Sequence, residues 1–288
     1  MRPALSVIFF TTLSGAGYGL LAWLGVLLAT LGYDLPAGLS SRAATPQWMT
    51  LLLVLLLTGC ALAGIGLLSS LLHLGKPGRA WRALSQWRTS WLSREGVMAL
   101  LTFVPLSLLL ALVLIGVIEG TYAPLRFAAC APVFGIAMSL LAIITVICTA
   151  MIYASLPPIP AWRHRLVVPV YVVFALLTGG LLLGAIVLLS GYDSHALVAI
   201  WVSLTAIVLA AMKFKYWRDI DATPLPATRG DAVGLPGRDV SVFEGPHTEP
   251  NYITREMAFV LARRHARALR WAALTLFGLV PVACMAPL

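Results

Sequence analysis

Charged side chains are scarce in this sequence. Only 11% of its 288 residues are Asp, Glu, Lys or Arg, whereas 60% are hydrophobic, and soluble domains usually carry about a quarter of charged residues. No charge lies in the interior of its seven longest apolar runs, which fits a cost of about 2.5–3.5 kcal/mol for each charge at mid-membrane. The composition therefore excludes an ordinary soluble domain and indicates an integral membrane protein.

Cysteine is also rare. Each of the four cysteines, Cys60, Cys130, Cys148 and Cys284, stands alone in an apolar run, without the C-x-x-C spacing typical of metal or redox sites. We interpret them as small buried hydrophobic residues. We expect no metal centre in this chain, so that any iron–sulfur cluster belongs to another subunit.

The apolar runs are long enough to be membrane spans, because about 20 residues cross the hydrocarbon layer as a helix. The first run exceeds the apolar core of about 7–15 residues in an export signal, so it is predicted to be a helix of the mature protein. The sequence predicts an all-α, polytopic transmembrane helical bundle that forms a single integral membrane domain over residues 1–288. The seven predicted spans are 5–31, 48–72, 97–118, 127–153, 167–190, 196–213 and 270–287.

Lysine and arginine are distributed unevenly between the two sides of this predicted bundle. Of the 20 Lys and Arg residues, all except Arg42 and Arg126 fall at the N-terminus or in the second, fourth and sixth loops. Basic residues favour the cytoplasmic side of short loops. We therefore expect a membrane protein with a cytoplasmic N-terminus and an external C-terminus.

The sixth loop, 214–269, is the only long polar segment. Its first part, 222–239, is rich in Pro, Gly and Asp and is predicted to be irregular. From about residue 251, apolar residues recur at helical spacing between arginines, which predicts a basic amphipathic helix before the last span. Such a helix could lie on anionic lipid headgroups or dock a cytoplasmic partner, and the sequence leaves both open.

The candidate functional region is segment 73–95, HLGKPGRAWRALSQWRTSWLSRE, because it places Arg and Trp residues between two apolar runs. His73 and Glu95 both lie where a predicted span meets water. A quinone suits this position, since its tail stays in lipid while its carbonyl oxygens need hydrogen-bond donors at the interface. His73 could donate such a bond and pass a proton, or it could merely cap its helix.

Glu95 is the only acidic residue between the second and third predicted spans. It could pair with Arg88 or Arg94, or it could carry protons with a pKa set by its surroundings. An acid is also favoured at a helix N-terminus by the helix dipole alone.

Tryptophan and arginine surround these two residues. Trp81, Trp87 and Trp91 could stack on a flat ring, although tryptophan gathers at membrane interfaces in any case. Arg79, Arg82 and Arg88 fit the charge bias described above and could equally meet an acidic partner. Haem is not expected, because His73 and His164 are the only histidines that could meet near one interface.

The sequence HLGKPGRAWRALSQWRTSWLSREG resembles the membrane-anchor subunits of dimethyl-sulfoxide-reductase-type molybdenum complexes, with their H-L-G-x-P segment and a following glutamate. The W-R-T-S-W-L-S-R-E run and the N-terminal SVIFFTTLSGAGYGL look most like the anchor of the cytoplasm-facing sulfite-oxidising enzyme. In that wider family eight spans are usual, against seven here.

The resemblance implies a quinone site, for ubiquinone or menaquinone, and two partners, a ferredoxin-like iron–sulfur subunit and a molybdopterin catalytic subunit. Membrane lipid is a further partner, and nucleic acid is not expected. Candidate quinone-binding residues are His73, Glu95, Arg82, Trp87, Trp91 and Arg94. Candidate docking residues are Lys76, Arg79, Arg88, Arg163 and Arg165.

Under this interpretation the chain passes electrons between the iron–sulfur subunit and quinone, in sulfite oxidation. It would have no activity toward the sulfur substrate on its own. Alternatives are the anchor of a dimethyl-sulfoxide-type reductase that oxidises quinol, a purely structural anchor, and an ion-coupled transporter. Prolines could kink spans as in transporters, but no intramembrane charge accompanies Pro105, Pro132 or Pro169.

Overall fold

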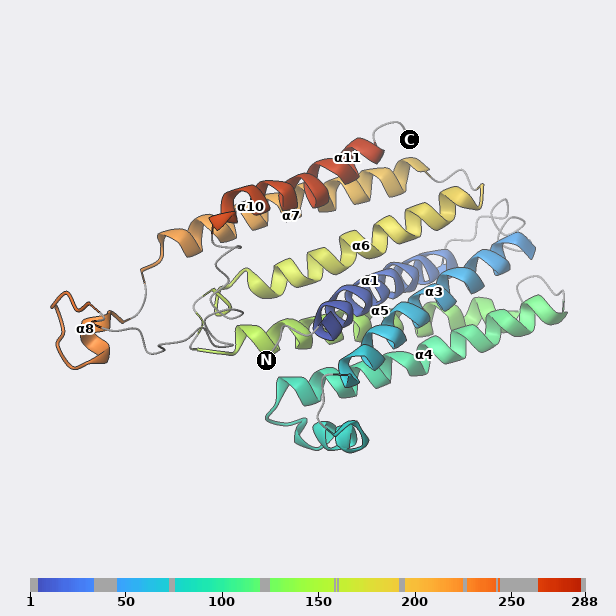
Figure 1. Ribbon diagram of the computed structural model, residues 1–288. Helices are drawn as coiled ribbons and strands as arrows, with labels where there is room; N and C mark the ends of the chain where they lie inside the picture. The colour runs from blue at the N-terminus through green and yellow to red at the C-terminus, as the bar shows by residue number, and fades with distance from the viewer. Residues whose placement is uncertain are drawn as a thin grey trace.

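The computed structural model of the protein describes residues 5–33, 46–72, 76–119, 125–157, 159, 161–191, 195–224, 227–241, 243 and 264–285. All regular elements over these residues are helices. Within the same ranges, seven spans are long and apolar enough to cross a membrane, which confirms the predicted all-α bundle (Figure 1).

The spanning helices follow one another in up-and-down order. They are α1 (Leu5–Tyr33), α3 (Pro46–Leu71), α4 (Trp91–Glu119), α5 (Leu125–Ala154), α6 (Val167–Leu189), α7 (His195–Ala222) and a last span made of α10 (Ala266–Leu274), the π-helical turn η3 (Thr275–Leu279) and α11 (Val280–Met285). Two shorter helices lie outside the spans, the 3-10 helix η1 (Pro77–Gln86) and α8 (Arg229–Ala232).

Helix α1 is the centre of the bundle, because it packs against α3, α5 and α6 at once. Small residues permit these contacts: a Cβ atom added to Gly19 would lie 1.8 Å from the carbonyl oxygen of Ala175 on α6, and one added to Gly25 would lie 2.3 Å from that of Gly135 on α5. Within a membrane, such close backbone approach is a main source of helix association.

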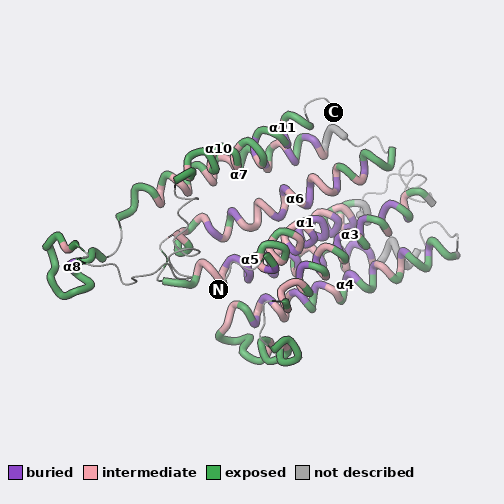
Figure 2. The backbone as a smooth tube through the Cα atoms, viewed as in Figure 1, coloured by how far each residue is buried: buried purple, intermediate pink, exposed green. Residues whose placement is uncertain are grey.

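The second layer consists of α7 and the last span, which join the bundle through α6 (Figure 1). A separate apolar cluster between α6 and α7 includes Leu177, Val202 and Leu209, and Phe277 of the last span packs against it. Most of the last span is exposed, in contrast to the buried face of α1 (Figure 2). It therefore presents a large apolar surface to its surroundings.

Helix α4 begins at Trp91, six residues before the predicted span at 97, so Glu95 lies within the helix. The apolar run marks the hydrocarbon-facing part of a helix and not its first turn. Here the first turn is polar because its side chains bond to η1: the hydroxyl of Ser93 donates to the carbonyl oxygen of Ala83.

Helix α7 continues to Ala222, nine residues beyond the end of its predicted span at 213. The additional turns carry charges that are satisfied locally, including the Lys215–Asp219 pair at 3.1 Å. After it, Thr228 and Asp231 form a capping box at the start of α8, inside the segment predicted to be irregular. The first thirteen residues of the predicted amphipathic helix, 251–263, lie outside the described residues.

The start of α1, η1 and α8 lie toward one end of the bundle, and the end of α11 lies toward the other (Figure 1). The α5–α6 connection, with Arg163 and Arg165, is at the same end as η1, because α4 and α5 are antiparallel neighbours. The fold thus gathers the basic second, fourth and sixth loops at one end.

The close packing of α1 and α6 predicts the effect of a single methyl group. Gly19→Ala should lower the free energy of unfolding by about 1–3 kcal/mol, because the added Cβ forces two backbones apart. Gly64→Ala on α3 is the matched control, since an added Cβ there meets no atom within 4 Å. Thermal unfolding in mild detergent measures both, and equal midpoints for the two variants would contradict this packing.

Candidate functional site

The polar segment between α3 and α4 is fastened to the start of α4. His73, with Leu74 and Gly75, lies outside the described residues. From Pro77 onward, η1 rests on the first turns of α4, where the side chain of Leu84 covers Gly96. Together with the Ser93–Ala83 bond, this contact fixes η1 beside Glu95.

Arg94 is occupied by backbone oxygens. Its Nε donates to the carbonyl oxygen of Trp87 at 3.0 Å, and its Nη2 donates to that of Arg88 at 2.6 Å. Its guanidinium lies 4.3 Å from the centre of the Trp91 ring, a cation–π distance. Arg94 therefore stabilises the turn between η1 and α4.

Glu95 has no ion pair in the part of the chain that the structure describes, so the pairing with Arg88 or Arg94 considered above is not formed. Its side chain is only 5% exposed. The hydroxyl of Thr149 on α5 has two acceptors within hydrogen-bond distance for its one proton, the Oε1 of Glu95 and the carbonyl oxygen of Thr145 at 3.1 Å. Glu95 is thus a buried carboxyl group that faces a neutral donor.

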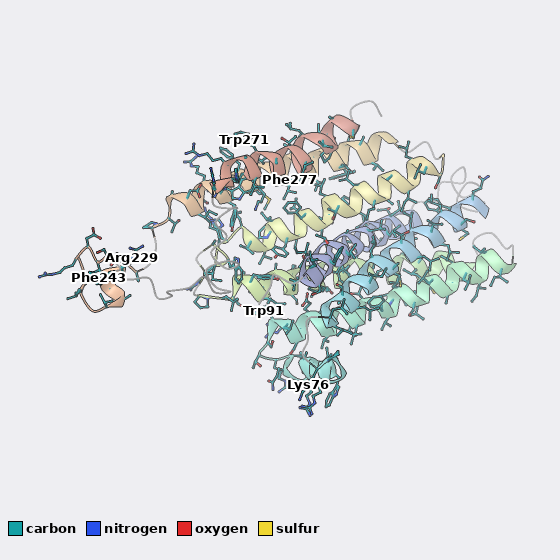
Figure 3. All side chains as sticks on the ribbon, in the orientation of Figure 1. Lys76, Trp91, Arg229, Phe243, Trp271 and Phe277 are labelled. Carbon is teal, nitrogen blue, oxygen red and sulfur yellow. The ribbon has the colours of Figure 1, made fainter. Side chains whose placement is uncertain are left out.

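The other predicted residues of segment 76–88, which contains η1, are exposed. Trp87 is 52% exposed, and Arg82 lies against the neighbouring Trp81 ring at 5.7 Å. The predicted docking residues Lys76, Arg79 and Arg88 are also exposed, with Lys76 at the outer tip of the segment (Figure 3). The structure therefore brings Trp91 and Arg94 together, directs Glu95 to Thr149 on α5, and leaves Arg82 and Trp87 on the outer surface.

His164 connects the α5–α6 loop to α7 through polar and ring contacts. Its Nδ1 accepts a hydrogen bond from the backbone of Leu166 at 3.2 Å, its Nε2 lies 3.3 Å from Asp219, and its ring packs edge-on against Tyr216. Arg163 and Arg165, on either side of it, are exposed. Across the described ranges, no group of three or more His, Cys, Asp or Glu residues could hold a metal ion.

Two adjoining cavities lie at the same end of the bundle, and sequence reasoning did not find them. The inner cavity, of about 450 Å³, lies between α1, α5, α6 and α7 and has Thr149 in its wall. The outer cavity, of about 330 Å³, lies nearer the helix ends and includes Tyr153 and Trp162. Both share Thr11, Val170, Tyr171 and Lys213. Thr149 therefore connects Glu95 to an apolar space that can hold a small molecule.

Tyr18 is another polar residue that lines the inner cavity. The residue is 2% exposed and lines the cavity, and its hydroxyl has no hydrogen-bond partner among the described residues. Buried tyrosine hydroxyls usually have a partner. The only sequence signal for this residue is its place between Gly17 and Gly19 in the first span, which marks close packing and not chemistry.

The arrangement can bind a hydrogen-bond acceptor and exchange a proton with it. The Tyr18 and Thr149 side chains line the inner cavity, the Glu95 carboxyl group lies behind Thr149, and several aromatic rings line the outer cavity. A carboxyl group without a fixed cation is free to act as a proton donor or acceptor.

Comparisons with known proteins agree on one family. The model of the family described as DMSO reductase anchor subunit (DmsC) matches residues 1–229. A sulfite dehydrogenase subunit of Allochromatium vinosum is 31% identical over 293 residues, which cover 98% of this chain and 85% of that protein. No solved structure matches the chain.

The Glu95–Thr149 contact predicts a stability difference between two threonine variants. Thr149→Val keeps the side-chain shape but leaves a buried carboxyl group without its donor, which should cost about 1–3 kcal/mol. Thr102→Val removes a buried hydroxyl whose partners are the neutral oxygens of Met98 and Thr145, and it should cost about 1 kcal/mol. Thermal unfolding measures both. A smaller loss for Thr149→Val than for Thr102→Val would argue against the contact.

Proposed function

Because the chain belongs to the DMSO reductase anchor subunit (DmsC) family and is the membrane anchor of a molybdoenzyme complex, we propose that it also supplies the quinone site of that complex. It would hold a ferredoxin-like iron–sulfur subunit and a molybdopterin catalytic subunit at the cytoplasmic face of the bacterial inner membrane. Electrons would pass between the clusters of the first partner and quinone bound in this chain.

Sulfite oxidation is the proposed direction. The relative from Allochromatium vinosum is named as part of a sulfite dehydrogenase and matches nearly the full length of this chain. In this direction two electrons arrive from the clusters, and quinone takes up two protons to become quinol. The alternative, a dimethyl-sulfoxide-type reductase, would run the same step in reverse, because the partner subunit determines the terminal substrate.

The observation that carries the quinone site is the environment of Glu95. A buried carboxyl group costs free energy unless it is hydrogen-bonded, and here the donor is a threonine that also borders a cavity. Nothing in the packing of α4 and α5 requires an acid at this position. A proton-transfer role explains both the residue and its placement near the end of the bundle.

The basic end of the bundle supports the proposed docking of partners. Lys76, Arg79 and Arg88 on the η1 segment and Arg163 and Arg165 between α5 and α6 are exposed at the end where α4 begins and α5 ends. Electrostatic attraction to an acidic iron–sulfur subunit would hold its clusters near Glu95. In this orientation, protons reach the site from the cytoplasm.

Two substitutions test the quinone site in the assembled complex. His73→Ala and Glu95→Gln should each lower sulfite-dependent quinone reduction by about 100-fold or more, the usual contribution of an acid–base group. Activity with a soluble dye that accepts electrons from the partner subunits should remain unchanged. Steady-state assays with ubiquinone and menaquinone analogues, in membranes that contain the complex, measure both quantities.

The controls are one histidine and one acid outside the proposed site. The control variants are His195→Ala and Asp239→Asn. His195 lies at the start of α7, at the opposite end of the bundle, and Asp239 lies after α8. Both should keep full quinone coupling. Copurification of the partner subunits verifies assembly of each variant. Normal quinone reduction in both His73→Ala and Glu95→Gln would contradict the proposed quinone site and would indicate that the chain is a structural anchor only.

A further inference from the structure

We propose that the quinone headgroup binds in the inner cavity between α1, α5 and α6, where Tyr18 donates a hydrogen bond to one carbonyl oxygen and Thr149 links the headgroup to Glu95. This inference rests on the proposed function and gives it a location. That location differs from the Arg and Trp residues of η1 to which the sequence points.

The first support is the unpartnered hydroxyl of Tyr18. Tyr18 is 2% exposed and lines the inner cavity, and its buried hydroxyl meets no acceptor among the described residues. Burying a donor without an acceptor is unfavourable, so an unpartnered buried hydroxyl in a native protein calls for an explanation, and a functional role is one of the recognised ones. A quinone carbonyl oxygen is an acceptor that lacks a proton of its own, so it complements the phenol.

The second support is the position of Glu95 relative to the cavity walls. Glu95 is buried on α4 and reaches across to α5, one of the helices that form the inner cavity. Thr149 bonds to Glu95 and lines the inner cavity as well. In the proposed relay the Thr149 hydroxyl turns toward the ligand and gives its proton to the ligand oxygen, while its own oxygen takes the proton of the protonated Glu95 carboxyl group. The resulting carboxylate then takes up a proton from the cytoplasmic end.

The third support is size and composition. The cavities measure about 450 and 330 Å³, within the range of about 300–1,000 Å³ that is usual for small-molecule sites. Phe174 and Tyr171 on α6 give the inner cavity flat apolar walls, and Val7 and Ile8 on α1 line the outer one.

The rings of η1 form a separate surface. The main contact of η1 within the bundle is with α4, whereas the inner cavity is lined by α1, α5, α6 and α7. Trp81 and Trp87 are more than half exposed. These two locations can be distinguished by experiment, because no described residue of η1 lines either cavity.

The first test removes only the Tyr18 hydroxyl. Tyr18→Phe in the assembled complex should raise the KM for a short-chain quinone by about tenfold, which is the loss of one hydrogen bond. Ser6→Ala is the matched control, because Ser6 is also buried on α1 with a hydroxyl that has no partner among the described residues, but it lines neither cavity. Ser6→Ala should leave the KM for the quinone unchanged. Neither variant should change the KM for a soluble dye.

The second test fills the cavity. Gly15 lines the inner cavity, and a Cβ added there meets no atom within 4 Å, so Gly15→Leu should fold normally and exclude the headgroup. Gly64→Leu on α3 adds the same bulk at another open glycine, away from both cavities. Only Gly15→Leu should lose quinone reduction.

A binding readout completes the experiment. An azido-substituted short-chain quinone should photolabel peptides of α1, α5 or α6 in the wild-type complex, and Gly15→Leu should abolish this labelling. Labelling confined to residues 76–91, together with a normal KM in Tyr18→Phe, would overturn the inner-cavity site. If Glu95→Gln still lost quinone coupling in that case, the proposed function would stand. If Glu95→Gln kept quinone coupling in that case, both the inner-cavity site and the proposed function would be wrong.

Discussion

The close approach of α1 to its three neighbours is the contact on which the rest of the bundle depends. In lipid there is little hydrophobic gain from bringing helices together, so association relies on dispersion contacts and interhelical hydrogen bonds. Gly17, Gly19 and Gly25 let α1 touch the backbones of α3, α6 and α5. The Trp23 indole then donates to the carbonyl oxygen of Leu176 on α6 at 2.8 Å. Tyr18 stands between two of these glycines, so the same packing that builds the centre also fixes this phenol at the cavity.

The two polar residues at the start of α4 show how one turn can hold a structural and a functional group. Arg94 is satisfied by two carbonyl oxygens and an aromatic ring, and its role is explained by the turn that it stabilises. Glu95, the next residue, points into the bundle and contacts a neutral hydroxyl. A buried acid of this kind is weak evidence for stability and stronger evidence for proton chemistry.

The outer layer is organised differently from the centre. A bidentate pair joins Arg270 to Asp221, with distances of 2.5 and 2.9 Å, and the Phe174 and Phe277 rings meet edge-on at 5.0 Å. The match to the anchor family ends at residue 229, before this last span begins. The cavities lie inside the matched region, with Lys213 and Tyr216 of α7 as their outermost walls. The last span is therefore attached to the proposed redox site through α7 and is not part of it.

The sequence alone determined the class of fold, because only helices and closed barrels span hydrocarbon and uncharged apolar runs of about 20 residues indicate helices. It also singled out Glu95 and the basic character of the loops, since charges in such a chain are few. It did not determine the partner of Glu95, because Thr149 lies on another helix and resembles any other threonine in an apolar run. Nor did it identify Tyr18 or the cavities, since an empty space exists only between helices that tertiary packing has placed. The boundaries of α4 and α7 differed from the apolar runs because local bonds to charged side chains extend a helix beyond its hydrophobic part.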